Sequence, residues 1–155
     1  MAELLATAAA VVEAFADAQA LDALAPAGAR ICRVAPDEMM LVSEPAAADR
    51  LTRDAGAVTA GDPDAVVVDA SDGWACWTIA GEGAEAAFAR LSELHAPKTG
   101  VVCGDVAHVP VRVLGDDGAL HLFVPSMWRD YLREQIVSRC AGVRETGEAT
   151  WGATA

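Results

Sequence analysis

VVVDASDGWACWTIAGEGAEAAFARL, residues 66–91, is typical of two strands joined by a turn and followed by a helix. An apolar run leads into a Ser-Asp-Gly turn, and the next segment alternates, with Trp74 and Thr78 on one face and Trp77 on the other. Apolar side chains within residues 84–91 then recur at helical spacing. The stretch therefore predicts a β-β-α unit.

The same order of elements recurs along the chain. Residues 31–35 and 39–43 are expected to form strands around a Pro-Asp-Glu turn, followed by a helix that ends near Gly56. Residues 101–124 contain three further apolar segments, and the segment 126–137 has the pattern of a closing helix. Together they predict an α+β fold with a mixed or antiparallel sheet, helices on one face and repeated β-β-α units, with a ferredoxin-like arrangement as the nearest common form.

Three regions are expected along the chain. Residues 1–28 are predicted to be an N-terminal helix and linker, because alanine is abundant and apolar side chains recur at seven- and four-residue spacings from Leu4 to Phe15. Residues 29–141 are predicted to form a single α+β domain. Residues 142–155 lack periodicity and are predicted to be a flexible tail. The N-terminal helix is expected to pack either on the domain or on a partner.

The composition excludes several classes of function. The chain has 155 residues, which is the size of one domain, and a net charge of -12. So negative a chain is poorly suited to nucleic acid or to an anionic membrane surface, since both require clustered Lys and Arg. The alanine-rich start has no positively charged region and carries acidic residues, so no signal peptide is expected and a cytoplasmic protein is predicted.

Ser126 is the first candidate nucleophile, because it lies at a strand-to-helix corner. A hydrolase elbow requires glycine two positions before and two after the serine, and Val124 and Trp128 stand there instead. The pattern favours a helix cap for the hydroxyl, a contribution of about 1 kcal/mol.

The remaining polar residues do not predict an active site. Cysteines stand at 32, 76, 103 and 140 without a C-x-x-C pair, and small buried hydrophobes are the favoured interpretation. Histidines stand at 95, 108 and 121 without metal-ligand spacing. The glycines of residues 80–85 and the acidic segments 69–73 and 115–118 are typical of turns. No catalytic, cofactor-binding or metal-binding residue is therefore assigned, and a subunit of a larger assembly is favoured.

Three ordered segments resemble a known family. VAPDEMMLV at residues 34–42, the stretch at 66–91 and HLFVPSMWRDYLREQI at 121–136 are similar in sequence and order to motifs of the gamma subunit of heterotetrameric sarcosine oxidase. The resemblance covers roughly residues 30–140. The sequence departs from the family at two places. The family usually has arginine after the aspartate motif, where this chain has Trp74 or a neighbour, and segment 93–105 is shorter than in the family.

The resemblance implies both a fold and a role. The implied fold is that of the amino-terminal folate-binding domain of the glycine cleavage T protein. The implied role is a non-catalytic structural subunit of a flavoenzyme complex that oxidises an N-methylated amine or amino acid. FAD, FMN, NAD, tetrahydrofolate and zinc are implied in the partner subunits, which are large flavin- and NAD-binding chains, and none of these groups is expected on this chain.

Under this hypothesis, Trp74, Trp128, Phe15 and Leu4 are possible interface residues, because interface cores are enriched in aromatic side chains. Trp77 and Tyr131 are instead expected to pack internally. One alternative is a freestanding folate-binding or aminomethyltransferase-like protein, in which Asp69 or Asp105 would be the candidate acid. Another is a scaffold or regulatory partner without redox association.

Overall fold

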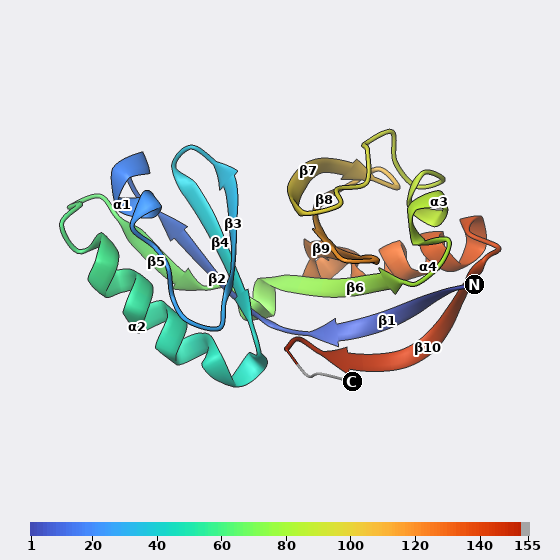
Figure 1. The fold of residues 1–155 in the computed structure, drawn as a ribbon, viewed down its shortest axis with the longest axis horizontal. Coiled ribbons are helices and arrows are strands. Elements are labelled where there is room, and N and C mark those ends of the chain that lie inside the picture. Colours follow the sequence, from blue (N-terminus) through green and yellow to red (C-terminus); the bar gives the residue numbers. More distant parts are fainter. Residues whose placement is uncertain (153–155) are drawn as a thin grey trace. The chain divides into compact units, whose positions relative to one another are not determined.

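A computed structural model of the chain describes residues 1–152, and these residues divide into two compact units. The six-stranded unit comprises Met1–Thr7 and Gly73–Ala149, and the four-stranded unit comprises Ala8–Asp72 and Thr150–Gly152. Figure 1 shows the elements of both units in their chain order. The sequence predicted one domain over residues 29–141, whereas the compact units here are built from segments that are discontinuous in the sequence.

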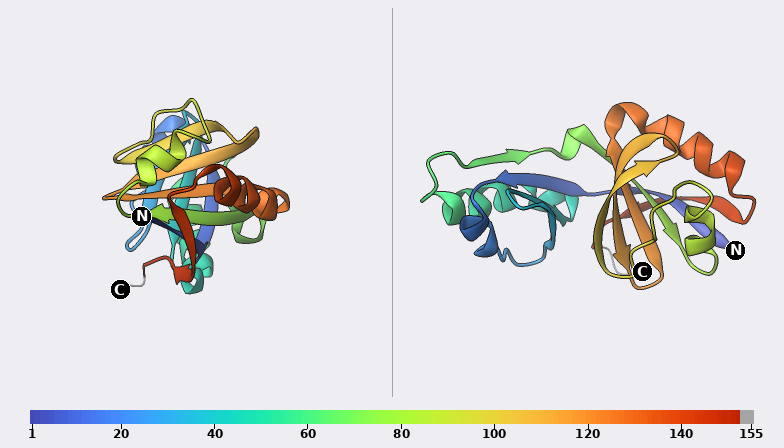
Figure 2. Two further views of the ribbon diagram at one scale, coloured as in Figure 1. Left: turned by 90° about the vertical axis from the view of Figure 1, so that its right-hand side faces the viewer. Right: turned by 90° about the horizontal axis from the view of Figure 1, so that it is seen from above.

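The six-stranded unit is a mixed sheet covered by two helices. The neighbouring strands β1, β6, β9, β8 and β7 pair antiparallel, while β10 and β1 run in the same direction (Figure 1). Helices α3 and α4 lie against this sheet (Figure 2), and their side chains share one core with its strands. The strands, in order across the sheet, are β10 (Val143–Thr150), β1 (Ala2–Ala8), β6 (Trp74–Ala80), β9 (Ala119–Pro125), β8 (Val109–Asp116) and β7 (Gly100–Val106), and the helices are α3 (Ala84–Phe88) and α4 (Arg129–Arg139).

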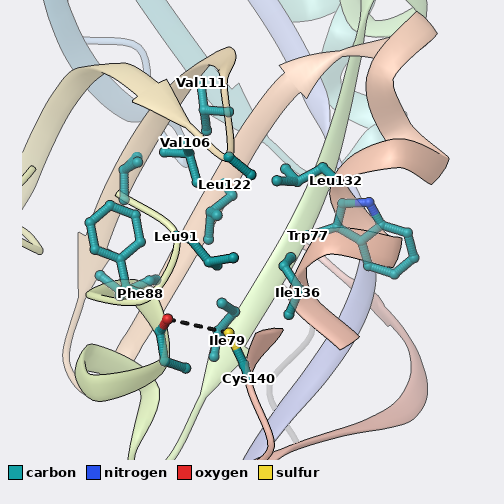
Figure 3. Close-up of a cluster of buried hydrophobic side chains, with 14 of the residues drawn as sticks. Trp77, Ile79, Phe88, Leu91, Val106, Val111, Leu122, Leu132, Ile136 and Cys140 are labelled. Atoms are coloured by element: carbon teal, nitrogen blue, oxygen red, sulfur yellow. Dashed lines mark hydrogen bonds between the residues drawn. The ribbon is translucent and has the colours of Figure 1, made fainter. Parts of the chain in front are cut away.

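The core of this unit explains why apolar side chains alternate along its strands. Trp77 and Ile79, odd-numbered residues of β6, belong to one core with Phe88 of α3 and Leu132 and Ile136 of α4, and the Trp77 ring lies beside α4 (Figure 3). Burial of a large apolar side chain stabilises a fold by about 1.5 to 3 kcal/mol. The period-2 pattern on the strand therefore meets the helical pattern on α3 and α4 in one continuous core.

The four-stranded unit is an antiparallel sheet with α2 on one face. Val12, Ala14 and Leu41 of the sheet pack against Leu51 and Ala55 of this helix. The strands, in order across the sheet, are β3 (Arg30–Ala35), β4 (Glu38–Ser43), β2 (Ala10–Phe15) and β5 (Val66–Asp69), and the helices are α1 (Ala18–Asp22) and α2 (Ala48–Thr59). Short 3-10 turns at Pro45–Ala47, Ser71–Gly73 and Ser126–Trp128 connect elements of the chain.

The α+β class is confirmed, and so are the strands predicted at residues 31–35, 39–43 and 101–124. The repeated β-β-α units are not confirmed. β3, β4 and α2 form a hairpin followed by a helix, but β5 and β6 do not form the predicted hairpin, because β5 pairs with β2 in one sheet and β6 with β1 and β9 in the other.

The predicted N-terminal helix is wrong. Ala2–Ala8 and Ala10–Phe15 are strands, and only Ala18–Asp22 is helical. In the first strand Ala2 and Leu4 lie in the core, which is the alternation of a strand rather than the spacing of a helix. Alanine favours helix intrinsically, but pairing with β6 and β4 outweighs a propensity of a few tenths of a kcal/mol per residue.

Two predictions near the C-terminus also differ from the structure. The predicted flexible tail is wrong over Val143–Thr150, which form β10, and residues 153–155 lie outside the described residues. The predicted cap at Ser126 is wrong as well. The helix α4 has Trp128 at its N-cap position without a side-chain cap, and a 3-10 turn precedes it.

Candidate functional site

The four predicted interface residues do not form one surface. Leu4 is fully buried in the core of the six-stranded unit, so it is unavailable to a partner and its assignment is wrong. Phe15 is 38% exposed and belongs to the four-stranded unit. Trp74 lies on the face of β6 opposite the helices, whereas Trp128 lies beside Tyr131 on the helical side.

The tryptophans and Tyr131 have defined partners. The guanidinium of Arg112 lies 4.4 Å from the centre of the Trp74 ring, a cation–π contact. Trp77 is buried, and its Nε1–H donates to the carbonyl oxygen of Arg129 at 3.0 Å. The Tyr131 hydroxyl donates to the carbonyl of Ala107 at 2.8 Å, so the expectation that Trp77 and Tyr131 pack internally is confirmed.

The thiols fit the prediction of small hydrophobes at three of four positions. Cys32, Cys76 and Cys140 are buried, and Cys103 is exposed. Burial raises the pKa of Cys76 to about 12, against a smaller lowering by a hydrogen bond with Thr78. A thiol with so high a pKa remains protonated at neutral pH and is a poor nucleophile.

A polar chain crosses three strands on the face of the six-stranded sheet away from the helices. Thr7 and Thr78 share a hydrogen bond of 2.6 Å between their hydroxyls, and the Thr78 hydroxyl lies 2.8 Å from Nδ1 of His121. Thr78 is buried, so this network satisfies a polar group that would otherwise be costly. It supports the structural interpretation of His121.

His108 occupies a two-residue turn between β7 and β8. Both Ala107 and His108 have positive φ, at 49° and 70°, as a type I′ hairpin requires. The Ala107 N–H donates to the carbonyl of Leu91 at 2.7 Å, and Tyr131 holds the Ala107 carbonyl. The hydrogen bonds within the unit therefore hold a turn that neither residue favours on its own.

Three surface hollows of about 530 to 600 Å³ lie in the six-stranded unit. One is lined by Gly81, Gly83 and Lys98, where the glycines have positive φ and precede a helix of only five residues. A second is lined by His108 together with charged residues of both signs. The third contains the bidentate pair of Arg133 with Glu145, at 2.8 and 2.5 Å, which joins α4 to β10.

Metal and pterin chemistry find little support in the described residues. Within residues 1–152, no group of three or more His, Cys, Asp or Glu side chains could hold a metal ion. The Asp69 carboxylate accepts from the Ser71 N–H at 3.0 Å and from its hydroxyl at 2.6 Å, so it is engaged in a local turn. Asp105 is exposed on β7. No described helix is long and apolar enough to cross a membrane.

An exposed apolar patch lies at the β5 edge of the four-stranded sheet, on the face opposite α2. Phe15 pairs with Val66, and Val68 follows on the same face of β5. Their exposed fractions are 38%, 52% and 43%. We call these three residues the β5 patch. The sequence predicted an apolar strand in this segment, and the structure places β5 at the edge of the sheet.

Comparison with solved structures shows the fold. A chain of heterotetrameric sarcosine oxidase from Corynebacterium sp. U-96, solved with pyrrole 2-carboxylate, aligns with a TM-score of 0.74 over 90% of this chain and 84% of its own, at 14% identity. The fold resembles that of this sarcosine oxidase chain. No protein-family model matches the chain, and no curated protein matches its sequence.

Two other structures share the fold. Aminomethyltransferase T of the glycine cleavage system from Bartonella henselae aligns with a TM-score of 0.69 at 12% identity, over 94% of this chain but 47% of its own. The regulatory subunit of aspartate kinase from Thermus thermophilus aligns with a TM-score of 0.53 at 13% identity, over 88% of this chain and 95% of its own. The chain thus spans about half the length of the aminomethyltransferase. The fold-level resemblance inferred from the three sequence segments is confirmed.

Proposed function

We propose that this chain is a structural subunit of an oxidoreductase complex similar to sarcosine oxidase, and that the complex oxidises an N-methylated amine or amino acid. One observation carries the proposal. The similarity to a chain of a heterotetrameric oxidase extends over 90% of this chain and 84% of the other. The proposed partners are large flavin- and NAD-binding subunits, which would hold FAD, FMN, NAD, tetrahydrofolate and zinc.

The chemistry of this chain agrees with a supporting role. The buried thiol of Cys76 has a raised pKa, and His121 is hydrogen-bonded within a polar network. Neither residue has the arrangement of a nucleophile with an adjacent base. Binding to a partner is therefore the favoured use of the exposed apolar surface.

A tagged copy expressed in the native host tests the proposal. The expected result is co-purification of large yellow subunits, with flavin absorbance near 450 nm in roughly stoichiometric amount. A colourless chain of 16.0 kDa that elutes alone would contradict it. Amine-dependent reduction of the flavin in the purified complex would identify the class of substrate.

A freestanding folate-binding protein is the second candidate, because the fold is also shared with the aminomethyltransferase. The alignment covers 47% of that enzyme's own chain, whereas it covers 84% of the sarcosine oxidase chain. Titration with tetrahydrofolate separates the two candidates. Saturable heat of binding, or saturable quenching of the tryptophan fluorescence of the isolated chain, would favour the folate-binding protein.

A further inference from the structure

The two edges of the four-stranded sheet differ in how they are protected. β3, at one edge, carries Arg30 and Arg33 and has an irregularity in its register between Arg33 and Ala35. Arg33 is further held by Asp22 and by the Pro36 carbonyl. Charged side chains and bulges are the usual means by which proteins prevent an edge strand from pairing with another chain. This edge is therefore closed to a partner.

β5, at the other edge, has no irregularity in its register, and its one charged side chain is Asp69 at its end. Its residues 66–68 are three valines, and two of them are exposed. Within the described residues 1–152, β5 pairs with β2 alone. An apolar and regular edge strand presents unpaired backbone N–H and C=O groups to which a further strand can bind.

The ladder shows which backbone groups face outward. The Ala70 N–H donates to the Val11 carbonyl at 2.8 Å, and Val12 is opposite Asp69. Because hydrogen-bonded pairs alternate in an antiparallel ladder, the backbone groups of Val66 and Val68 point toward β2. Those of Val67 and Asp69 point to the outer edge.

The charge around β5 defines the chemistry of the partner. No lysine or arginine lies between Arg53 and Arg90 in the sequence, whereas Asp62 and Asp64 precede the strand and Asp69 is its last residue. A second copy would bring the same carboxylates together, and like charges at paired positions are destabilising.

We propose that the edge of β5 binds an extended strand of a partner subunit, antiparallel or parallel to β5, whose alternating apolar residues contact the β5 patch and whose flanks carry Lys or Arg. The backbone of Val67 and Asp69 supplies the hydrogen bonds, and Phe15, Val66 and Val68 supply the apolar contact. The identity of the partner as a subunit of the oxidoreductase complex rests on the proposed function. The strand-binding edge itself rests on the sheet alone.

Amide exchange on the full chain tests the edge directly. The probe is a synthetic peptide with a Val-Thr-Val-Thr-Val core and a pair of lysines at each end. In the free protein the amides of Val66 and Val68 are protected by β2, and those of Val67 and Asp69 exchange freely. At saturating peptide, the amides of Val67 and Asp69 become protected.

A matched pair of variants locates the site. Val66→Lys is expected to weaken the affinity for the peptide by at least about tenfold, because it removes apolar contact and adds a charge of the same sign as the peptide's lysines. Ile31→Lys is the control, since Ile31 is 37% exposed on the opposite edge strand. Its affinity for the peptide should lie within about twofold of that of wild type. A peptide with proline at the central valine, or with glutamate in place of lysine, should lose binding.

Three results would overturn the proposal. The first is unchanged exchange at Val67 and Asp69 with saturating peptide. The second is equal weakening by Val66→Lys and Ile31→Lys. The third is a concentration-dependent dimer that protects Val67 and Asp69 without any peptide, which would assign the edge to a second copy.

The native complex separates this inference from the proposed function. If flavoprotein subunits co-purify with wild type but are lost with Val66→Lys, both stand. If they are retained with Val66→Lys, the proposed function stands and the edge is not the docking site. If wild type brings no flavoprotein, the proposed function fails, and the peptide experiment still decides whether β5 accepts a strand.

Discussion

At the scale of single residues, the Cys76 thiol shows what burial does to an ionisable side chain. It lies on the face of β6 that also carries Thr78, and it is buried. Burial disfavours the thiolate, which is why the pKa rises to about 12 from its ordinary value of 9.0. Since the thiol is inert at neutral pH, its contribution is to packing.

This raised pKa predicts a loss of stability in alkali. Between the two pKa values the unfolded chain loses the proton and the folded chain keeps it, so the free energy of unfolding falls as pH rises from about 9 toward 12. Between pH 8 and pH 10, wild type should lose roughly 1 kcal/mol more than Cys76→Ala. Urea denaturation at both pH values measures the difference.

Cys103→Ala is the matched control, because this thiol is exposed. It should follow wild type across the same pH range. An identical pH dependence for wild type and Cys76→Ala would contradict the assigned environment of Cys76.

At the scale of elements, the close approach of another backbone segment determines which residue can stand at position 115. The sequence predicted residues 115–118 as a hairpin loop, yet β8 continues through Asp116 and Gly115 is a strand residue. The backbone of Pro97 crosses so close to it that a β-carbon at Gly115 would lie 2.0 Å from the Pro97 carbonyl oxygen. Glycine in a strand often marks such a close approach of another backbone.

Gly115→Ala should therefore lower the free energy of unfolding by about 1 to 3 kcal/mol, since two backbone segments must separate. Thermal and urea denaturation measure this change. Gly56→Ala is the control, because Gly56 lies within α2 and no heavy atom is within 4 Å of the added carbon. It should raise stability by about 0.5 to 1 kcal/mol. Equal effects at both positions would refute the contact with Pro97.

At the scale of the whole molecule, β10 completes the six-stranded sheet. The Ala2 N–H donates to the Gly142 carbonyl at 3.0 Å, Val143 packs against the core, and Arg133 pairs with Glu145. Without β10, β1 would become an edge with unpaired backbone groups. The segment predicted as a flexible tail is thus part of the fold.

Deletion of residues 142–155 should lower the melting temperature by at least about 5 °C and promote self-association through the exposed edge of β1. Calorimetry and size-exclusion chromatography measure the two effects. Deletion of residues 153–155 alone is the control and should leave β10 paired. Unchanged melting and elution after the longer deletion would show that β10 is dispensable.

The sequence by itself determined the elements whose signals are local. The hairpin at Pro36, the strands of residues 101–124 and the helices after Pro45 and Pro125 were predictable, because turn residues and apolar periodicity act within a few positions. The internal packing of Trp77 was also predictable, and the three ordered segments led to the correct fold resemblance.

Only the tertiary structure decided the remaining features, because they depend on pairing between distant segments. The alanine-rich start becomes two strands through pairing of β1 with β6 and of β2 with β4, and no signal within that segment outweighs the helical preference of alanine. Leu4 is in the core and Val66 is at an edge, although both are apolar residues in apolar runs. Whether such a side chain meets a core or solvent is decided by strand order, which forms only when both sheets are assembled.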